Sequence, residues 1–517
     1  MIVIKGCVLQ SYKYFIESWE DYMQEFTESF KRICQEAKLV GANFVVVKED
    51  KMVNHCIYGM QSLEKNKATN EKTIYRIASI SKTVGAIALM QLVEAKKIDL
   101  ERDISDYFGF LIRNPKYPDD PITVKMLTLQ TSSIMDGYDD ENPAYDDIRK
   151  GYNGVNGTRL DVRVKDLLVE NDGPYYTPLT FSDYKPGTRF IYSNFGCGLM
   201  ACLIEIASGE YYTDYMENHI FKPLQLDASF VASHIHHQEL IADLYYPQKD
   251  SEEGYKVAVT AERFVNGGYP KFPLGENFRG PAGGLFISMP DLSVIMRMFL
   301  QGGIVNQVRL LQKETVDYMI QQHWFGKGDS ESYWAKGIQM KVLHSFPEKP
   351  FRGHTGGAYG VRSYMYFDVK NQLGICFITN GGYREKETHR GIIDLFYDTL
   401  ELVINHYWPK QEPKTEFTFA IGEKLAHIDQ RIVKLPIAPF VQEEEIYLPA
   451  ISLADGLNIV AHRNEEKDLI SFTKKGLKIE YSGLLEKQGV IIIPLKKTLQ
   501  ALNIPFEIKG KEVKIIS

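Results

Sequence analysis

Residues 84–93 are apolar on almost every side, and they constrain the fold more than any other segment of this chain. A run of this length suits a helix better than a strand. A helix that is apolar all round has to be buried on every side. The chain therefore needs a large core in which other layers cover this helix. Its 517 residues, 44% hydrophobic and 25% charged, are sufficient for such a core.

The bulk properties exclude several classes of protein. The length suggests about three domains, and the net charge of −7, from 60 basic and 67 acidic residues, gives no reason to expect a nucleic-acid partner. No run approaches the roughly 18 apolar residues of a membrane helix. The first fourteen residues lack the pattern of a secretory signal, which by itself suggests the cytoplasm and leaves the compartment open. The six cysteines form no CxxC pair and no zinc spacing, so we expect free, mostly buried thiols, no metal site and no cofactor.

Hydrophobic periodicity predicts a mixed set of elements. Helical spacing of apolar residues indicates helices over residues 15–40 and 391–407. Two pairs of strand-like runs predict hairpins, namely 44–48 with 52–58 and 361–367 with 373–379. Between residues 110 and 280 short apolar segments alternate with long loops, and loops of this kind often line a site.

A charged segment with two prolines and no apolar anchor, residues 409–415, has the composition of a linker. It predicts a large domain over residues 1–408 and a small domain over residues 416–517.

The part after the linker contains an internal repeat. Ile446-Tyr447-Leu448-Pro449 recurs as Ile491-Ile492-Ile493-Pro494, and Leu457-Asn458-Ile459 recurs as Leu502-Asn503-Ile504, both with an offset of 45 residues. Each unit indicates a strand, a proline, a short helix, a turn and a strand, and two such units can pack face to face in one small α+β domain. The pattern loosely resembles the repeat domain at the N-terminus of some copper amine oxidases and on bacterial surface proteins. No metal ligands accompany it, so we interpret it as a structural or binding appendage.

Ser79 and Lys82 form an SxxK motif immediately before the buried helix. On a helix the two side chains share one face, and an amine can accept the serine proton if burial and nearby positive charge lower its pKa. The backbone N–H of Ser79 at the helix start can serve as half of an oxyanion hole. The motif alone is weak, because it occurs three more times, at Ser62–Lys65, Ser182–Lys185 and Ser471–Lys474. A lysine that opens a buried helix, however, has to be desolvated or paired, and this context distinguishes Ser79.

Tyr192-Ser193-Asn194 is the only segment of the chain in which a tyrosine begins a YxN pattern. A tyrosine near a lysine can relay protons, and an asparagine amide can hold a substrate amide or orient the lysine. A buried tyrosine with a structural asparagine at a turn is the alternative.

Gly353-His354-Thr355-Gly356-Gly357 precedes a predicted strand. Glycines allow a substrate backbone to lie along a strand edge, and the N–H of Gly357 is a candidate second oxyanion donor. A turn that contains a hydrogen-bonded histidine is the alternative.

The three motifs together, in the order SxxK, YxN, HTG, resemble the serine β-lactamase and penicillin-binding-protein superfamily. The most similar branch is that of class C β-lactamases with their D-alanyl carboxypeptidase, D-aminopeptidase and esterase relatives. Segments 75–83, 97–107, 186–194, 221–224 and 282–285 also fit, so the resemblance spans roughly residues 20–405. It implies an α/β (α+β) fold, with an antiparallel sheet flanked by helices and a mostly helical subdomain.

The resemblance also implies an activity. Ser79 would form an acyl-enzyme with an amide, peptide or ester, with Lys82 and Tyr192 sharing the proton and no metal taking part. Asn194, His354, Thr355, Gly356 and Gly357 would bind the substrate, a small molecule or peptide that could derive from a cell wall. The family suggests a bacterial cell surface, in contrast to the missing export signal. A non-catalytic sensor that binds penicillin or peptidoglycan is the alternative function.

The chain departs from the family pattern in two places. His354 stands where many relatives have a lysine, and a largely neutral histidine would bind a substrate carboxylate less well. Arg352 or Arg362 could supply the missing charge. Gln130 and Ser133 replace a frequent histidine and glycine in a segment that we interpret as structural.

Overall fold

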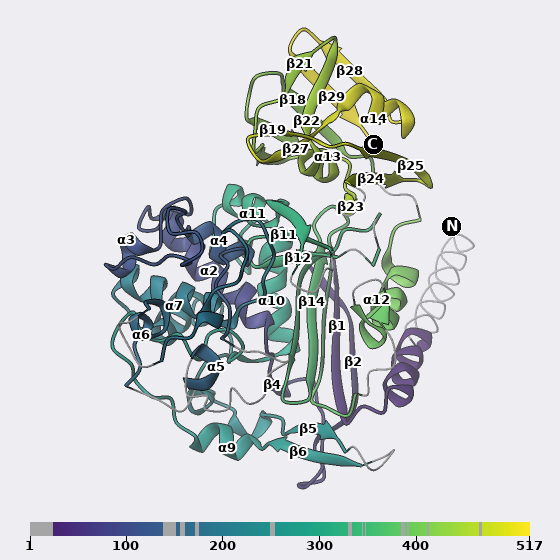
Figure 1. The fold of residues 1–517 in the computed structure, drawn as a ribbon. Coiled ribbons are helices and arrows are strands. Elements are labelled where there is room, and N and C mark those ends of the chain that lie inside the picture. Colours follow the sequence, from purple (N-terminus) through teal and green to yellow (C-terminus); the bar gives the residue numbers. More distant parts are fainter. Residues whose placement is uncertain are drawn as a thin grey trace, which may run out of the picture.

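An antiparallel sheet forms the centre of the computed structural model (Figure 1). The structure describes residues 24–137, 151–155, 161–170, 175–248, 254–328, 333–343, 345–346, 348–383, 388–389, 392–410, 413–464 and 468–517. Within these residues the sheet has nine strands in the order β10 (Trp324–Lys327), β11 (Tyr333–Gly337), β12 (Met340–Val342), β13 (Arg352–Ala358), β14 (Val361–Asp368), β15 (Leu373–Thr379), β1 (Gly41–Lys48), β2 (Lys51–Ser62) and β3 (Lys67–Ala68). Both predicted hairpins, β1–β2 and β14–β15, are confirmed.

Both faces of this sheet are buried, which explains why its central strands are continuous apolar runs. Side chains alternate between the faces of a strand. On β14, Tyr364 and Tyr366 belong to one hydrophobic cluster, whereas Met365 and Phe367 belong to another. Each cluster needs its own layer of helices.

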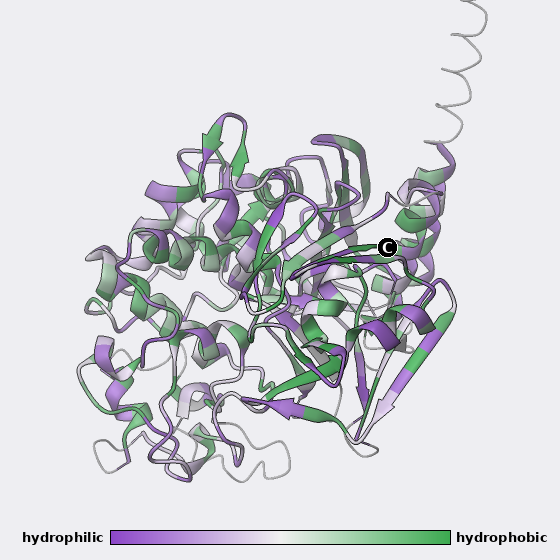
Figure 2. Ribbon diagram, turned by 90° about the horizontal axis from the view of Figure 1, so that it is seen from above, coloured by the Kyte–Doolittle hydropathy of each residue, from purple (hydrophilic) through white to green (hydrophobic). Residues whose placement is uncertain are grey.

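Helices supply those two layers (Figure 1). The helix of residues 24–36 and α12 (Asp394–Tyr407) cover one face, and α10 (Met289–Leu300) packs on the other. The helices α2 (Ile80–Glu94) and α7 (Asn194–Ser208) pack against each other in the helical part of the fold. The predicted helix over residues 15–40 is confirmed from residue 24, and its earlier part lies outside the described residues. The second predicted helix begins at Asp394 rather than at residue 391. The helices carry both hydrophobic and hydrophilic segments in Figure 2, as expected for layers that cover a sheet.

The helix α2 occupies the position that its composition predicted. Twelve of its fifteen residues are buried, and it packs against α7 and β13. The arrangement confirms the predicted class, an antiparallel sheet flanked by helices with a mostly helical subdomain. The described cysteines are buried free thiols. Within the described parts of the chain, no helix combines the length and the apolar character needed to cross a membrane.

The residues after the linker form separate sheets around a hydrophobic cluster that contains Phe417, Leu448 and Ile493. The two repeat units begin with β22 (Glu445–Pro449) and β27 (Val490–Pro494), which continue into α13 (Ala450–Gly456) and α14 (Leu495–Ala501). These strands pair antiparallel, with Tyr447 opposite Pro494, Leu448 opposite Ile493 and Pro449 opposite Ile492. A local two-fold axis near Leu448 therefore relates each residue of this strand in the first unit to the residue 45 positions later in the second unit.

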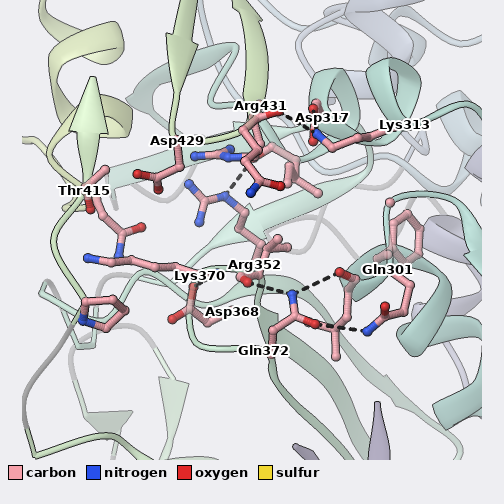
Figure 3. A pocket seen from close by; sticks show the side chains of 18 of the residues that line it. Gln301, Lys313, Asp317, Arg352, Asp368, Lys370, Gln372, Thr415, Asp429 and Arg431 are labelled. Atoms are coloured by element: carbon pink, nitrogen blue, oxygen red, sulfur yellow. Dashed lines mark hydrogen bonds and ion pairs between the residues drawn. The ribbon is translucent and has the colours of Figure 1, made fainter. Parts of the chain in front are cut away.

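Asp455 of α13 joins this C-terminal part to the central sheet. Its buried carboxylate accepts hydrogen bonds from Arg352 Nη2 at 2.8 Å, Gln322 N at 2.8 Å and Gln322 Nε2 at 3.1 Å. A cavity of about 570 Å³ lies beside this contact (Figure 3). Arg352 of β13 and Arg431 of the C-terminal part both line it. Because Arg352 belongs to β13, the C-terminal part contacts the strand that carries the HTG motif.

We expect Asp455→Ala to lower the free energy of unfolding by about 3–5 kcal/mol, because it removes the carboxylate that is ion-paired with the buried Arg352 guanidinium. Urea unfolding of both proteins measures the difference. The exposed pair Lys509–Glu507 provides the control. Glu507→Gln should change stability by less than about 0.5 kcal/mol, and an equally small effect of Asp455→Ala would contradict the prediction.

Candidate active site

Ser79 lies at the start of α2 in a backbone turn that directs its hydroxyl away from the usual capping role. Ala78 before it has φ of 53°, an uncommon conformation for a residue with a Cβ atom. A serine at the N-terminus of a helix normally accepts a hydrogen bond from the first turn, but the Ser79 side chain makes no such bond. Its Oγ is therefore available to other groups.

The amine of Lys82 is fully buried and is held by oxygen atoms from three separate segments. Nζ donates to Ser79 Oγ at 3.1 Å, to Asn194 Oδ1 at 2.8 Å and to the carbonyl of Ala282 at 2.7 Å. A lysine ammonium has three N–H donors, so these acceptors satisfy all of them. The amine has one position and one orientation, directly beside the Ser79 hydroxyl.

Tyr192, which lies just before α7, contacts the same hydroxyl from a different segment of the chain. Its OH donates to Ser79 Oγ at 2.6 Å, and its ring lies 4.8 Å from Lys82 Nζ. The contact between ring and amine is a cation–π interaction when the amine is protonated. Ser79 Oγ therefore has two partners, an amine and a phenol, that can each exchange a proton with it.

Asp136 orients the YxN segment, and sequence reasoning missed it. The carboxylate accepts from Asn194 Nδ2 at 2.8 Å, from Ser193 Oγ at 3.0 Å and from Phe195 N at 2.8 Å. It lies at the N-terminus of α7, where an anion is favoured, and it fixes Asn194 so that its oxygen faces Lys82. The only signal in the sequence was its position at the start of a long loop.

The HTG strand, β13, packs directly against the segment that leads to Ser79. A Cβ on Gly356 would lie 2.5 Å from the carbonyl oxygen of Ile77 and 2.3 Å from Ser363 Oγ, so only glycine fits there. Ser363 Oγ in turn donates to the Ile77 carbonyl at 2.9 Å. This close contact brings the predicted substrate strand alongside the nucleophile segment.

His354 is buried at the same place. Its Nδ1 lies 2.5 Å from the carbonyl of Thr355, so Nδ1 carries the proton and Nε2 is left as an acceptor. Nε2 is buried and has no hydrogen-bond partner among the described residues. Burial, followed by the positive charges of Lys341, Lys336 and Lys82, lowers the pKa of His354 well below its usual value. The ring is therefore neutral at pH 7.

Of the two arginines considered as substitutes for the missing lysine, Arg352 is engaged by other groups and Arg362 lies beside the HTG strand. Arg352 donates to Asp455, to the Ile320 carbonyl and to the Pro350 carbonyl. Arg362 lies beside Gly357, where a Cβ would be 3.4 Å from its Nη1.

Gln130, interpreted as structural, accepts a hydrogen bond from Ser193 N at 2.7 Å and so contacts the YxN segment.

The fold is that of a β-lactamase-type protein, and comparison with known proteins agrees. The Beta-lactamase family model matches residues 19–396, so the chain belongs to the Beta-lactamase family.

Relatives and solved structures extend this comparison. Protein flp of Staphylococcus aureus is 26% identical over 206 residues, which cover 40% of this chain and 38% of flp. The mouse serine beta-lactamase-like protein LACTB is 24% identical over 59% of this chain and 65% of its own length. The chain thus spans less than two thirds of either relative.

Two solved structures share the fold. The octameric penicillin-binding protein homologue from Pyrococcus abyssi has a TM-score of 0.53 and 17% identity, over 97% of this chain and 100% of that chain. The hydrolase EstCE1 has a TM-score of 0.55 and 17% identity, over 75% of this chain and 98% of its own.

The neutral state of His354 predicts a pH effect on stability. Below pH 6.5, its ordinary pKa, the unfolded chain gains a proton that the folded protein does not bind, so acid favours unfolding. The loss is about 1.4 kcal/mol per pH unit, or about 2 kcal/mol near pH 5. The free energy of unfolding of His354→Gln, relative to that of wild type, should therefore rise by about 2 kcal/mol as the pH falls from about 7.5 to about 5. Urea unfolding at both pH values measures the difference.

The solvent-exposed His427 provides the control for loss of an imidazole. If wild type and His354→Gln lose stability in parallel on acidification, the histidine is not held neutral.

Proposed function

We propose that the chain is a serine hydrolase that forms an acyl-enzyme on Ser79 and acts on an amide, peptide or ester. The observation that carries this proposal is the approach of Tyr192 OH, at 2.6 Å, and Lys82 Nζ, at 3.1 Å, to a single serine oxygen. Membership of the Beta-lactamase family supports it.

In the first step, Ser79 Oγ attacks the carbonyl carbon of the substrate. The serine proton passes to the unprotonated member of the Lys82–Tyr192 pair, and the carbonyl oxygen becomes an anion. The backbone N–H groups of Ser79 and Gly357 bind that oxygen, at the positive end of α2 and on β13. The same pair then returns the proton to the leaving group, and the acyl group remains on Oγ.

In the second step, a water molecule replaces the leaving group. It loses a proton to the same pair as it attacks the acyl carbon, and the returning proton releases Ser79. Asn194 holds Lys82 through its oxygen, while the Nε2 acceptor of His354 can receive a hydrogen bond from the substrate. Thr355, Gly356 and Gly357 form the strand edge along which the substrate lies.

Proteins of the same fold supply the compound classes that we propose to test. Solved structures with this fold include a D-amino acid amidase from Ochrobactrum anthropi, 18% identical with a TM-score of 0.52, and a hydrolase with promiscuous acyltransferase activity. We therefore propose D-amino-acid amides, short peptides and simple esters as the compounds to screen.

Ser79→Ala should abolish hydrolysis of these compounds and labelling by a fluorophosphonate, because it removes the attacking oxygen. Intact-mass spectrometry measures the adduct on wild type and variant. Ser471→Ala removes the serine of another SxxK match in the C-terminal part, and it should leave both unchanged.

Hydrolysis that persists in Ser79→Ala would refute the proposal. Labelling of Ser79 without release of product would instead indicate a protein that binds its ligand covalently as a sensor.

Tyr192→Phe should lower kcat by about 10²- to 10⁴-fold, the usual contribution of a proton-transferring group. The ring remains beneath Lys82, so the loss reports on the hydroxyl alone. Steady-state hydrolysis of the best ester measures it. The exposed Tyr246 gives the matched control, since Tyr246→Phe removes a hydroxyl elsewhere. An unchanged kcat in Tyr192→Phe would leave Lys82 as the sole proton acceptor.

A further inference from the structure

The hairpin β11–β12 places two lysines next to the HTG strand. Lys336 on β11 lies directly opposite Lys341 on β12, and Lys341 lies directly opposite Gly353, the neighbour of His354. Like charges in opposite positions of a sheet destabilise it. An arrangement that violates a local rule in this way is expected at functional sites.

Lys336 is fully buried, and its amine has no hydrogen-bond partner among the described residues. Nζ lies 4.8 Å from the ring of Phe190, which is two residues before Tyr192 in the chain. The amine is therefore next to the segment that brings Tyr192 to Ser79. A buried, unpaired ammonium is costly, and a bound anion would offset that cost.

Electrostatic effects show that these groups share one region with the nucleophile. Burial lowers the pKa of His354 most, followed by Lys341, Lys336 and Lys82. Burial also lowers the pKa of Lys336 well below its usual value, and Lys341 and Lys82 act in the same direction. Burial and Lys82 lower the pKa of Lys341 to about 8. Several amines thus converge beside a neutral histidine whose Nε2 has no hydrogen-bond partner among the described residues.

We propose that Lys336 and Lys341 form a subsite that binds a carboxylate group of the substrate. The charge that the family pattern places at position 354 is supplied here by the adjacent hairpin. This inference rests on the proposed function, because it assigns the substrate class of the same site. It also reverses the expectation that His354 in place of lysine weakens the binding of carboxylates.

A carboxylate suits this position better than a neutral group for two reasons. Each ammonium can donate a charge-assisted hydrogen bond to it, and such bonds are stronger than neutral ones. A bound anion also favours the protonated form of both amines, whereas a neutral substrate leaves the burial that lowers the pKa of Lys336 uncompensated. The neutral ring of His354 can then accept a hydrogen bond from the substrate without competing for the anion.

The test measures binding separately from catalysis. Ser79→Ala protein, which keeps both lysines, is titrated by calorimetry with two matched pairs of esters. In one pair the acyl group carries the acid, as the 4-nitrophenyl esters of glutaric and glutaramic acid. In the other pair the leaving group carries it, as the butyryl esters of 4-hydroxybenzoic acid and its amide. Each pair differs only in a carboxylate and an amide.

We expect the Ser79→Ala protein to bind the carboxylate of at least one pair more tightly than the amide. Adding Lys336→Met should weaken this preference about 10- to 100-fold, the range for a hydrogen bond to a charged group. Lys341→Met should act in the same direction and serves if the first variant does not fold. Lys487, which lies exposed over the ring of Phe440, is the control, because Lys487→Met removes a stacked lysine elsewhere.

Equal binding of carboxylate and amide in both pairs would overturn the inference, as would a preference that both lysine variants retain. Neither result affects the proposed function, which is tested by labelling and turnover of the wild-type protein. Conversely, a wild-type protein that binds the carboxylate selectively but never acylates Ser79 would keep the subsite and refute the hydrolase.

Discussion

The buried amine of Lys82 is the interaction on which the rest of this structure depends. Burying an ammonium costs several kcal/mol unless all of its donors find partners. Here the partners come from Ser79 just before α2, from the first residue of α7 and from the Ala282 carbonyl. Satisfying one side chain therefore draws three distant segments together, and that convergence places the Ser79 hydroxyl between an amine and a phenol.

The second constraint is the contact between β13 and the nucleophile segment. Gly356 allows the strand to approach the Ile77 carbonyl, and Ser363 of the next strand donates to that carbonyl. At the start of β13, Arg352 is bound to Asp455 of the C-terminal part. The HTG strand is thus held near both ends, by the nucleophile segment and by the appended residues.

Only the first of the two repeat units supplies the buried carboxylate that binds Arg352. The position equivalent to Asp455 in the second unit is Gln500, which is exposed. The two units share the strand and helix that build their common core, but only the first unit has the buried carboxylate that pairs with Arg352. The symmetry therefore belongs to the core of the C-terminal part, whereas the contact with the central sheet uses one unit.

Local patterns in the sequence determined much of this protein. The apolar run 84–93, the two hairpins, the helix around residues 24–36 and the candidate residues Ser79, Lys82, Tyr192 and His354 can all be read from residue order, because periodicity and short motifs are local properties. The sequence could not indicate that Asp136 orients Asn194, that Arg352 is engaged by Asp455, or that Lys336 lies opposite Lys341. Those relations depend on strand register and on contacts between residues far apart in the chain, and only the tertiary structure decided them.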